Sequence, residues 1–159
     1  MLWLLACATG EYPLEVEINP EDVEFPWVAY DEAAPESVEV GIRNRGEGPV
    51  YLTLGAFEGE GAGNLSVVGE VDDKLLMPGR GVDIRVGLSR NTQEWSDGEF
   101  ELDLPIEGVS GVGGGAGAGY RHGGTTDVFV LPVLVRIDCD LDDDGEESTV
   151  CGGEDWEGA

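Results

Sequence analysis

The chain has 159 residues, which is enough for one domain with a hydrophobic core of its own. It carries 34 Asp and Glu residues against 8 Lys and Arg residues, a formal net charge of −26. Such a charge repels nucleic-acid phosphates and anionic lipid headgroups, so it argues against a nucleic-acid partner and against electrostatic attachment to a membrane.

The chain begins with a short apolar run that ends at Cys7. Its last four residues, Leu4-Leu5-Ala6-Cys7, resemble the lipobox of bacterial lipoproteins, in which the signal peptide is cut before a cysteine that carries the lipid. The resemblance implies that residues 1–7 are a signal remnant with its lipobox, and that Cys7 anchors the protein in a membrane of the cell envelope, on the periplasmic or cell-surface side. The run lacks a basic segment and is shorter than the usual ~7–15-residue apolar core of a signal peptide, so a fortuitous apolar start on a cytosolic protein is the alternative.

Alternation of apolar and polar residues follows a short tether predicted over residues 8–13. Leu14, Val16 and Ile18 alternate with acidic residues, and this period of two predicts a strand with one face buried and one face in water. The same pattern recurs, separated by turn signals, over residues 38–43, 50–54, 82–88 and 100–106. The run over residues 127–137 is apolar on both faces, which predicts a central strand. The sequence therefore predicts an all-β fold, an antiparallel β-sandwich of about seven strands over residues 14–137.

Four short motifs narrow this fold class. They are an opening strand that ends at Pro20, the element Val23-Glu24-Phe25, the turn Asn44-Arg45-Gly46, and Leu76-Met77-Pro78-Gly79. With these motifs, residues 14–107 and 126–137 resemble the ASPM/SPD-2/Hydin-type immunoglobulin-like domain, which is also found in bacterial "choice-of-anchor D" surface proteins. The resemblance implies an immunoglobulin-like sandwich that serves as a scaffold or binding module rather than as an enzyme. Asn44 and Gly46 suit this turn because both tolerate a positive φ, which we expect the turn to require.

Residues 108–124 are very rich in glycine and separate the last two predicted strands. Glycine-dense segments lack side chains to bury and stay flexible. We therefore expect a long mobile loop inserted in the last hairpin. It is either a binding loop at one end of the sandwich or a neutral insertion at a permissive loop tip.

The C-terminal segment, residues 138–159, is dominated by acidic residues. Carboxylates at alternate positions, followed by a glycine that permits a sharp turn, supply the hard oxygen ligands that Ca²⁺ requires. The predicted calcium ligands are Asp140, Asp142, Asp144 and Glu146. The spacing resembles the first half of an EF-hand loop and, more closely, the thrombospondin type 3 and other Asp-rich metal-binding repeats of bacterial surface proteins. A disordered or loop-like acidic tail without metal is the alternative.

The chain has three cysteines. If Cys7 carries a lipid, Cys139 and Cys151 remain as a pair, and a disulfide between them suits an oxidising, extracytoplasmic compartment. Such a disulfide would close a loop around the acidic turn.

Catalysis has little support in the sequence. The only histidine, His122, lies in the glycine-rich segment, where a side chain is poorly positioned for chemistry. The glycine run also lacks the Gly-Lys-Ser/Thr ending of a phosphate loop. We therefore expect no enzyme, but a lipid-anchored structural or adhesive module that contacts an unidentified envelope or surface protein through strand edges or loops. Two alternatives are a calcium-responsive module, whose acidic tail orders on Ca²⁺, and a hydrolase that uses His122.

Overall fold

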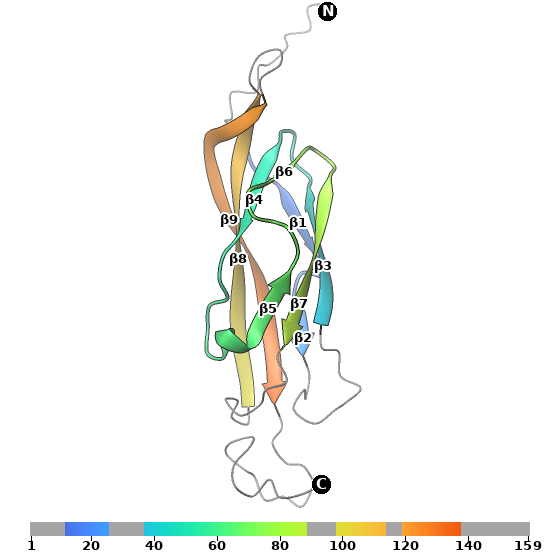
Figure 1. Cartoon of the computed structure of the whole chain (residues 1–159), viewed down its shortest axis with the longest axis vertical. Coiled ribbons are helices and arrows are strands. Elements are labelled where there is room, and N and C mark those ends of the chain that lie inside the picture. Colours follow the sequence, from blue (N-terminus) through green and yellow to red (C-terminus); the bar gives the residue numbers. More distant parts are fainter. Residues whose placement is uncertain (1–11, 26–36, 89–97, 114–118, 138–159) are drawn as a thin grey trace, which may run out of the picture.

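A computed structural model describes residues 12–25, 37–88, 98–113 and 119–137. These residues form nine strands and one 3₁₀ turn (Figure 1). The elements are β1 (Val16–Asn19), β2 (Val23–Phe25), β3 (Ser37–Asn44), β4 (Val50–Leu54), η1 (Ala62–Asn64), β5 (Leu65–Val68), β6 (Lys74–Leu76), β7 (Gly81–Leu88), β8 (Gly98–Gly113) and β9 (Tyr120–Ile137). Within the described residues, no helix has the length and apolarity needed to cross a membrane.

The strands form two sheets that pack against each other as a sandwich (Figure 1). One sheet has the order β1-β3-β7-β5 and the other has the order β2-β9-β8-β4-β6. Every pair is antiparallel except that of β2 with β9, which is parallel. The chain changes sheet between β1 and β2, just after the cis peptide Asn19–Pro20. The predicted immunoglobulin-like β-sandwich is confirmed.

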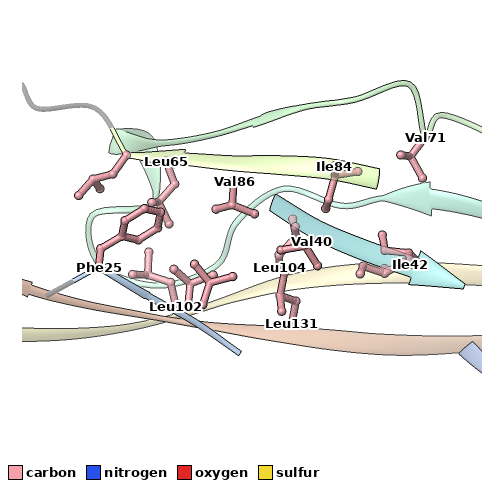
Figure 2. Packing of buried hydrophobic residues seen from close by; sticks show 14 of the residues in the cluster. Phe25, Val40, Ile42, Leu65, Val71, Ile84, Val86, Leu102, Leu104 and Leu131 are labelled. Carbon is pink, nitrogen blue, oxygen red and sulfur yellow. The ribbon is translucent and has the colours of Figure 1, made fainter. Parts of the chain in front are cut away.

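The core lies between the sheets and is built from the alternating apolar positions of the sequence (Figure 2). Val40 and Ile42 of β3 and Ile84 and Val86 of β7 face the other sheet and are at most 1% exposed. Burying each such side chain contributes roughly 1.5–3 kcal/mol. Phe25 is fully buried and anchors the short β2 in this core.

Asn44 holds the turn after β3, although not for the reason that the sequence predicts. Its side chain is 1% exposed, and its Nδ2 donates to the backbone oxygens of Gly48 (2.8 Å) and Leu76 (2.9 Å). Its Oδ1 accepts from the amide of Gly46 (2.9 Å). Neither Asn44 nor Gly46 has a positive φ, so the expectation of a left-handed backbone was wrong. A positive φ lies instead at Gly79 (77°), in the predicted Pro78-Gly79 turn.

The predicted tether over residues 8–13 extends too far, because Tyr12 belongs to the folded body. The Tyr12 hydroxyl bonds to the backbone oxygen of Pro49 and lies 2.9 Å from the backbone oxygen of Gly111. Its ring lies over Gly48, where a Cβ atom would come within 2.1 Å of the ring. Residues 8–11 lie outside the described part of the chain.

The glycine-rich segment is largely strand, which corrects the prediction of a loop over residues 108–124. β8 runs to Gly113, β9 begins at Tyr120, and the two strands pair as far as these residues. Glycines permit close packing here: a Cβ at Gly123 would lie 2.4 Å from the Ser110 hydroxyl oxygen. At Gly111 the amide donates to Pro49 O at 2.8 Å. Residues 114–118, at the tip of the hairpin, lie outside the described residues.

Candidate functional site

The outer edge of β9 is open along most of its length. β9 has 18 residues and pairs with β8 along its whole length, apart from an irregularity opposite Val109–Gly111. On its other side it pairs only with β2, at Val133, Leu134 and Val135. No other strand of the described residues pairs with this side, so the edge over residues 126–131 has no strand partner in the part of the chain that the structure describes. Such an edge is a template for a further strand.

The direction of the free backbone groups follows from the partners of β8. Pro132 lies opposite Asp103, whose amide and carbonyl both bond to Glu58, at 2.9 Å each, on the side away from β9. The Pro132–Asp103 pair is therefore a non-hydrogen-bonded pair of the antiparallel ladder, and the backbone of Pro132 faces away from β8, toward the side on which β2 pairs. This also explains why a proline, which has no N–H, fits within β9.

The same argument applies to the next residues along the edge. Pro105 lies opposite Val130, and the carbonyl of Pro105 accepts from Gly55 N at 2.8 Å on the side away from β9. The N–H and C=O of Val130 therefore point to the free edge, and by alternation so do those of Val128. The edge thus presents a backbone donor at Val130 and backbone acceptors at Val128 and Val130, while the outward N–H of Val128 donates to the exposed Asp127 Oδ1 at 2.9 Å, a bond that an added strand would replace.

The outer face of β9 is apolar, and β9 lies between β2 and β8, as the sequence predicts, but the described residues leave this face uncovered. The inward residues Leu131, Val133 and Val135 are at most 1% exposed, whereas Val128 is 53% and Val130 is 48% exposed. The side chains that share the outer face therefore belong to the residues whose backbones face the free edge. The face and the edge form one continuous surface.

Carboxylates flank this apolar face on both sides. Leu134 of β9 lies between Glu24 of β2 and Glu101 of β8, which are its register partners. Pro132 pairs with Asp103 of β8, and Asp22 lies beside it, just before β2. A groove of about 440 Å³ lies over these two rows, with the lining residues Asp22, Glu24, Glu101, Leu102, Asp103, Pro132, Val133 and Leu134. No Lys or Arg of the described residues lines it, so its four carboxylates have no counter-charge from that part of the chain within the groove.

A hollow of similar volume, about 440 Å³, lies on the outer face of the other sheet, but its charges are mixed. It is lined by Glu17, Glu39 and Asp83 together with Arg43 and Arg45. Arg45 bonds to Glu17, and the hydrogen bond from its guanidinium lowers the pKa of Glu17, although both groups are exposed. Because its charges are partly paired, this hollow offers less uncompensated charge to a ligand than the groove over β9.

His122 lies on β9, near the β8–β9 hairpin end of the sheet that contains β4 and β6. It does not lie on the loop that the sequence predicts. Its Nε2 lies 2.5 Å from Asp73 Oδ1, and its ring stands edge-on to Tyr51 with the centroids 4.3 Å apart. These contacts fix the hairpin against β4 and the turn before β6. Among the described residues, no three His, Cys, Asp or Glu side chains converge as metal ligands.

All of the site residues predicted from the sequence lie outside the described residues. These are the lipidation site Cys7, the disulfide pair Cys139 and Cys151, and the calcium ligands Asp140, Asp142, Asp144 and Glu146. They stay predictions. The groove over β9 was missed, although the alternating acids of β8 beside a strand that is apolar on both faces were visible in the sequence.

No protein-family model matches the chain, and no curated protein matches it. Several solved structures are similar in fold. The periplasmic chaperone SfaE matches with a TM-score of 0.54 and 13% identity over 77% of this chain and 58% of that chain. The E. coli chaperone DraB matches with a TM-score of 0.52 and 9% identity over 78% of this chain and 55% of that chain.

A third similar structure is a chain of the CsuC–CsuE chaperone–tip adhesion subunit pre-assembly complex of Acinetobacter baumannii. It matches with a TM-score of 0.50 and 11% identity over 79% of this chain and 58% of that chain. In all three cases the match covers less than two thirds of the other chain. At these identities the likeness shows the fold alone, an immunoglobulin-like sandwich, and the finer ASPM/SPD-2/Hydin assignment stays a prediction.

Proposed function

We propose that this protein is an extracytoplasmic binding module that holds a protein partner by adding one strand of that partner to the free edge of β9. The observation that carries this proposal is the pairing of the 18-residue β9. On its outer side only three residues pair with a strand of the described part of the chain, and the backbone groups of Val128 and Val130 are directed outward. Strand addition uses such groups for affinity and neighbouring side chains for specificity. No catalytic residue enters this mechanism.

The similar structures support a role in protein–protein contact. One of them is a chaperone in complex with a tip adhesion subunit, and the others are chaperones, one of them named as periplasmic. By this analogy of fold, the partner is an envelope or surface protein. The lipobox-like motif at Cys7 supports attachment of the module to the membrane of that compartment.

The test is a proline substitution at the free edge. Peptides are selected from a phage-displayed random decapeptide library against the full chain, synthesised, and titrated by fluorescence anisotropy into the wild type, Val128→Pro and Val128→Thr. Since the N–H of Val128 faces outward and donates to the exposed Asp127 side chain in the unbound chain, proline removes a donor of the edge without breaking the β8–β9 ladder. Circular dichroism checks that both variants fold.

We expect Val128→Pro to weaken binding at least tenfold and Val128→Thr to bind within about twofold of the wild type, because threonine keeps the N–H and favours strands. Equal binding by a folded Val128→Pro would contradict strand addition at this edge. In that case the selected peptides occupy another surface, and their site would be mapped by chemical cross-linking.

A second candidate is a calcium-responsive role for the segment over residues 138–159. The observation that favours it is the alternation of Asp140, Asp142 and Asp144 before Gly145, which supplies oxygen ligands at a turn. Under this proposal Ca²⁺ orders the segment, and the Cys139–Cys151 disulfide limits its freedom before the metal binds. The two roles are compatible, because the segment directly follows β9 in the chain.

A further inference from the structure

We propose that the segment that adds to β9 is basic, and that it lays Lys or Arg side chains across the groove formed by Asp22, Glu24, Glu101 and Asp103. This inference rests on the proposed function, since it assigns the chemistry of the partner strand. It starts from the order of side chains across the outer face. In each of two successive rows, an apolar side chain of β9 lies between two acidic side chains.

The arrangement suits the shape of a long basic side chain. Lys and Arg place an apolar stem on an apolar surface and carry the charge at its end. Pro132 and Leu134 offer the apolar floor, and the exposed Val130 continues it toward the free edge. Neighbouring strands are about 4.8 Å apart, so β8 lies about 10 Å from an added strand. The free edge ends next to Pro132, whose register partner on β8 is Asp103, so a basic side chain near that end of the added strand can cross β9 to the carboxylates of β8.

The observations disfavour the other occupants of this face. A divalent cation needs several carboxylates that converge on one point, and no such group exists among the described residues. A second copy of this chain would bring another net charge of −26 to an already acidic face. An anionic membrane surface is repelled for the same reason. An extended basic segment is the occupant whose charge and spacing both match.

At one end of the groove, a carboxylate of β8 already forms an ion pair with a basic side chain of β9. Arg136 of β9 bonds to Glu99 of β8, its register partner, at 3.3 Å between Nε and Oε2. Glu101 and Asp103 continue the same row of β8, but they lie opposite Leu134 and Pro132, which cannot neutralise them. The row therefore contains one pair completed within the chain and two positions at which a partner would supply the cation.

The experiment uses two capped decapeptides as probes, one alternating Thr and Lys and the other alternating Thr and Gln. Each is titrated into the ¹⁵N-labelled full chain, and chemical shifts report both affinity and location. The groove variant is Glu24→Gln with Glu101→Gln. The control is Glu60→Gln with Glu70→Gln, which removes the same charge from exposed positions outside the groove. Val128→Pro is titrated in parallel.

We expect the Thr-Lys peptide to shift the resonances of β9 and of the groove, and to bind about three- to tenfold more weakly to the groove variant, since each exposed ion pair contributes modestly. The control variant should stay within about twofold of the wild type. Equal weakening of both double variants would show non-specific attraction to an acidic protein and would overturn the inference. Equal affinity of the Thr-Gln peptide, or no saturable binding of the Thr-Lys peptide, would overturn it as well.

The variants separate this inference from the function on which it rests. If Val128→Pro binds the Thr-Lys peptide as the wild type does while the groove variant does not, the acidic groove binds a basic peptide and strand addition at Val128 is contradicted. If Val128→Pro loses binding of both peptides and the groove variant keeps both, strand addition is supported and the role of the acidic groove is contradicted.

Discussion

The side-chain amide of Asn44 donates a hydrogen bond to the backbone oxygen of Leu76 at 2.9 Å, which ties the turn after β3 to the end of β6 in the opposite sheet. The same nitrogen reaches Gly48 O, and Gly79 N donates to Asn44 O at 2.8 Å. One buried amide therefore joins two turns that lie at the same end of the sandwich. It sets the relative position of the sheets without contributing to the apolar core.

Asn44→Ala is expected to lower the free energy of unfolding by about 2–4 kcal/mol, because it removes the amide that donates to the buried backbone oxygens of Gly48 and Leu76 and leaves Gly46 N with Glu15 O alone. Urea denaturation followed by circular dichroism measures the loss. Glu47→Ala, at an exposed position of the same turn, should change the free energy by less than about 0.5 kcal/mol. An Asn44→Ala variant as stable as that control would remove the role assigned to this amide.

Two neighbouring glycines of β9 offer a matched test of the glycine-rich hairpin. A Cβ at Gly123 would lie 2.4 Å from Ser110 Oγ and 3.0 Å from Ser110 O, whereas nothing lies within 4 Å of a Cβ at Gly124. We expect Gly123→Ala to cost about 1–3 kcal/mol by overpacking. Gly124→Ala should be neutral or slightly stabilising, because it restricts the unfolded chain. Thermal unfolding of the two variants checks this, and equal midpoints would favour the mobile loop that the sequence predicts.

The unfolding free energy should fall at alkaline pH because of Tyr12. Burial raises the pKa of Tyr12 above its ordinary value of 10.0, against the opposing hydrogen bond at Gly111 and with a smaller contribution from Tyr120. A raised pKa in the folded state means that the stability from the neutral hydroxyl is complete below about pH 10 and is lost as the pH rises through the folded-state value.

The measurement for Tyr12 is urea unfolding at a series of pH values from 8 to 11, on the wild type and on Tyr12→Phe. The variant should be less stable at pH 8 by about 1 kcal/mol, for the lost hydrogen bonds, and should lose less stability than the wild type as the pH rises. Parallel pH profiles for the two proteins would contradict the assignment. Tyr51→Phe, which keeps the ring that stands against His122, serves as the control.

Much of the fold could be predicted from the sequence, because a period of two reports which side chains a facing sheet buries. β3 and β7 follow this pattern closely, with alternating buried and exposed residues. The short β5 and β6 were missed because a strand of three or four residues is too short to show a period. Alternation also does not say whether a further layer covers the second face, so the sequence could not show that Val128 and Val130 on the outer face of β9 are exposed.

The candidate site was harder to predict because it depends on pairing between distant parts of the chain. The groove exists only because Glu24 of β2 and Glu101 of β8 lie on either side of Leu134, and local sequence patterns do not encode that register. The role of the glycines near Gly123 also depends on pairing between distant residues. In isolation they indicate flexibility, whereas in the hairpin they permit close approach to Ser110.

Lipidation of Cys7 predicts a simple labelling result. The gene is expressed in a bacterium with its upstream sequence, grown with radiolabelled palmitate, and compared with Cys7→Ser. The wild type should carry label and sediment with the membrane fraction, whereas Cys7→Ser should do neither, because the thiol is the site of the lipid in the lipobox resemblance. Equal labelling of both proteins would remove the lipid anchor from the proposed function.

Calcium titration of the full chain tests the acidic segment. By isothermal calorimetry we expect saturable binding that Asp142→Asn weakens at least tenfold, because it removes one charged ligand from the centre of the predicted set. Asp72→Asn, at an exposed position of the sandwich, should leave binding unchanged. If Cys139 and Cys151 form the predicted disulfide, its reduction should also weaken binding, because an open loop costs more conformational entropy to order around the metal. If the wild type and Asp142→Asn give the same weak, unsaturable heats, the segment is an acidic tail, and the binding function would then rest on the edge and groove of β9.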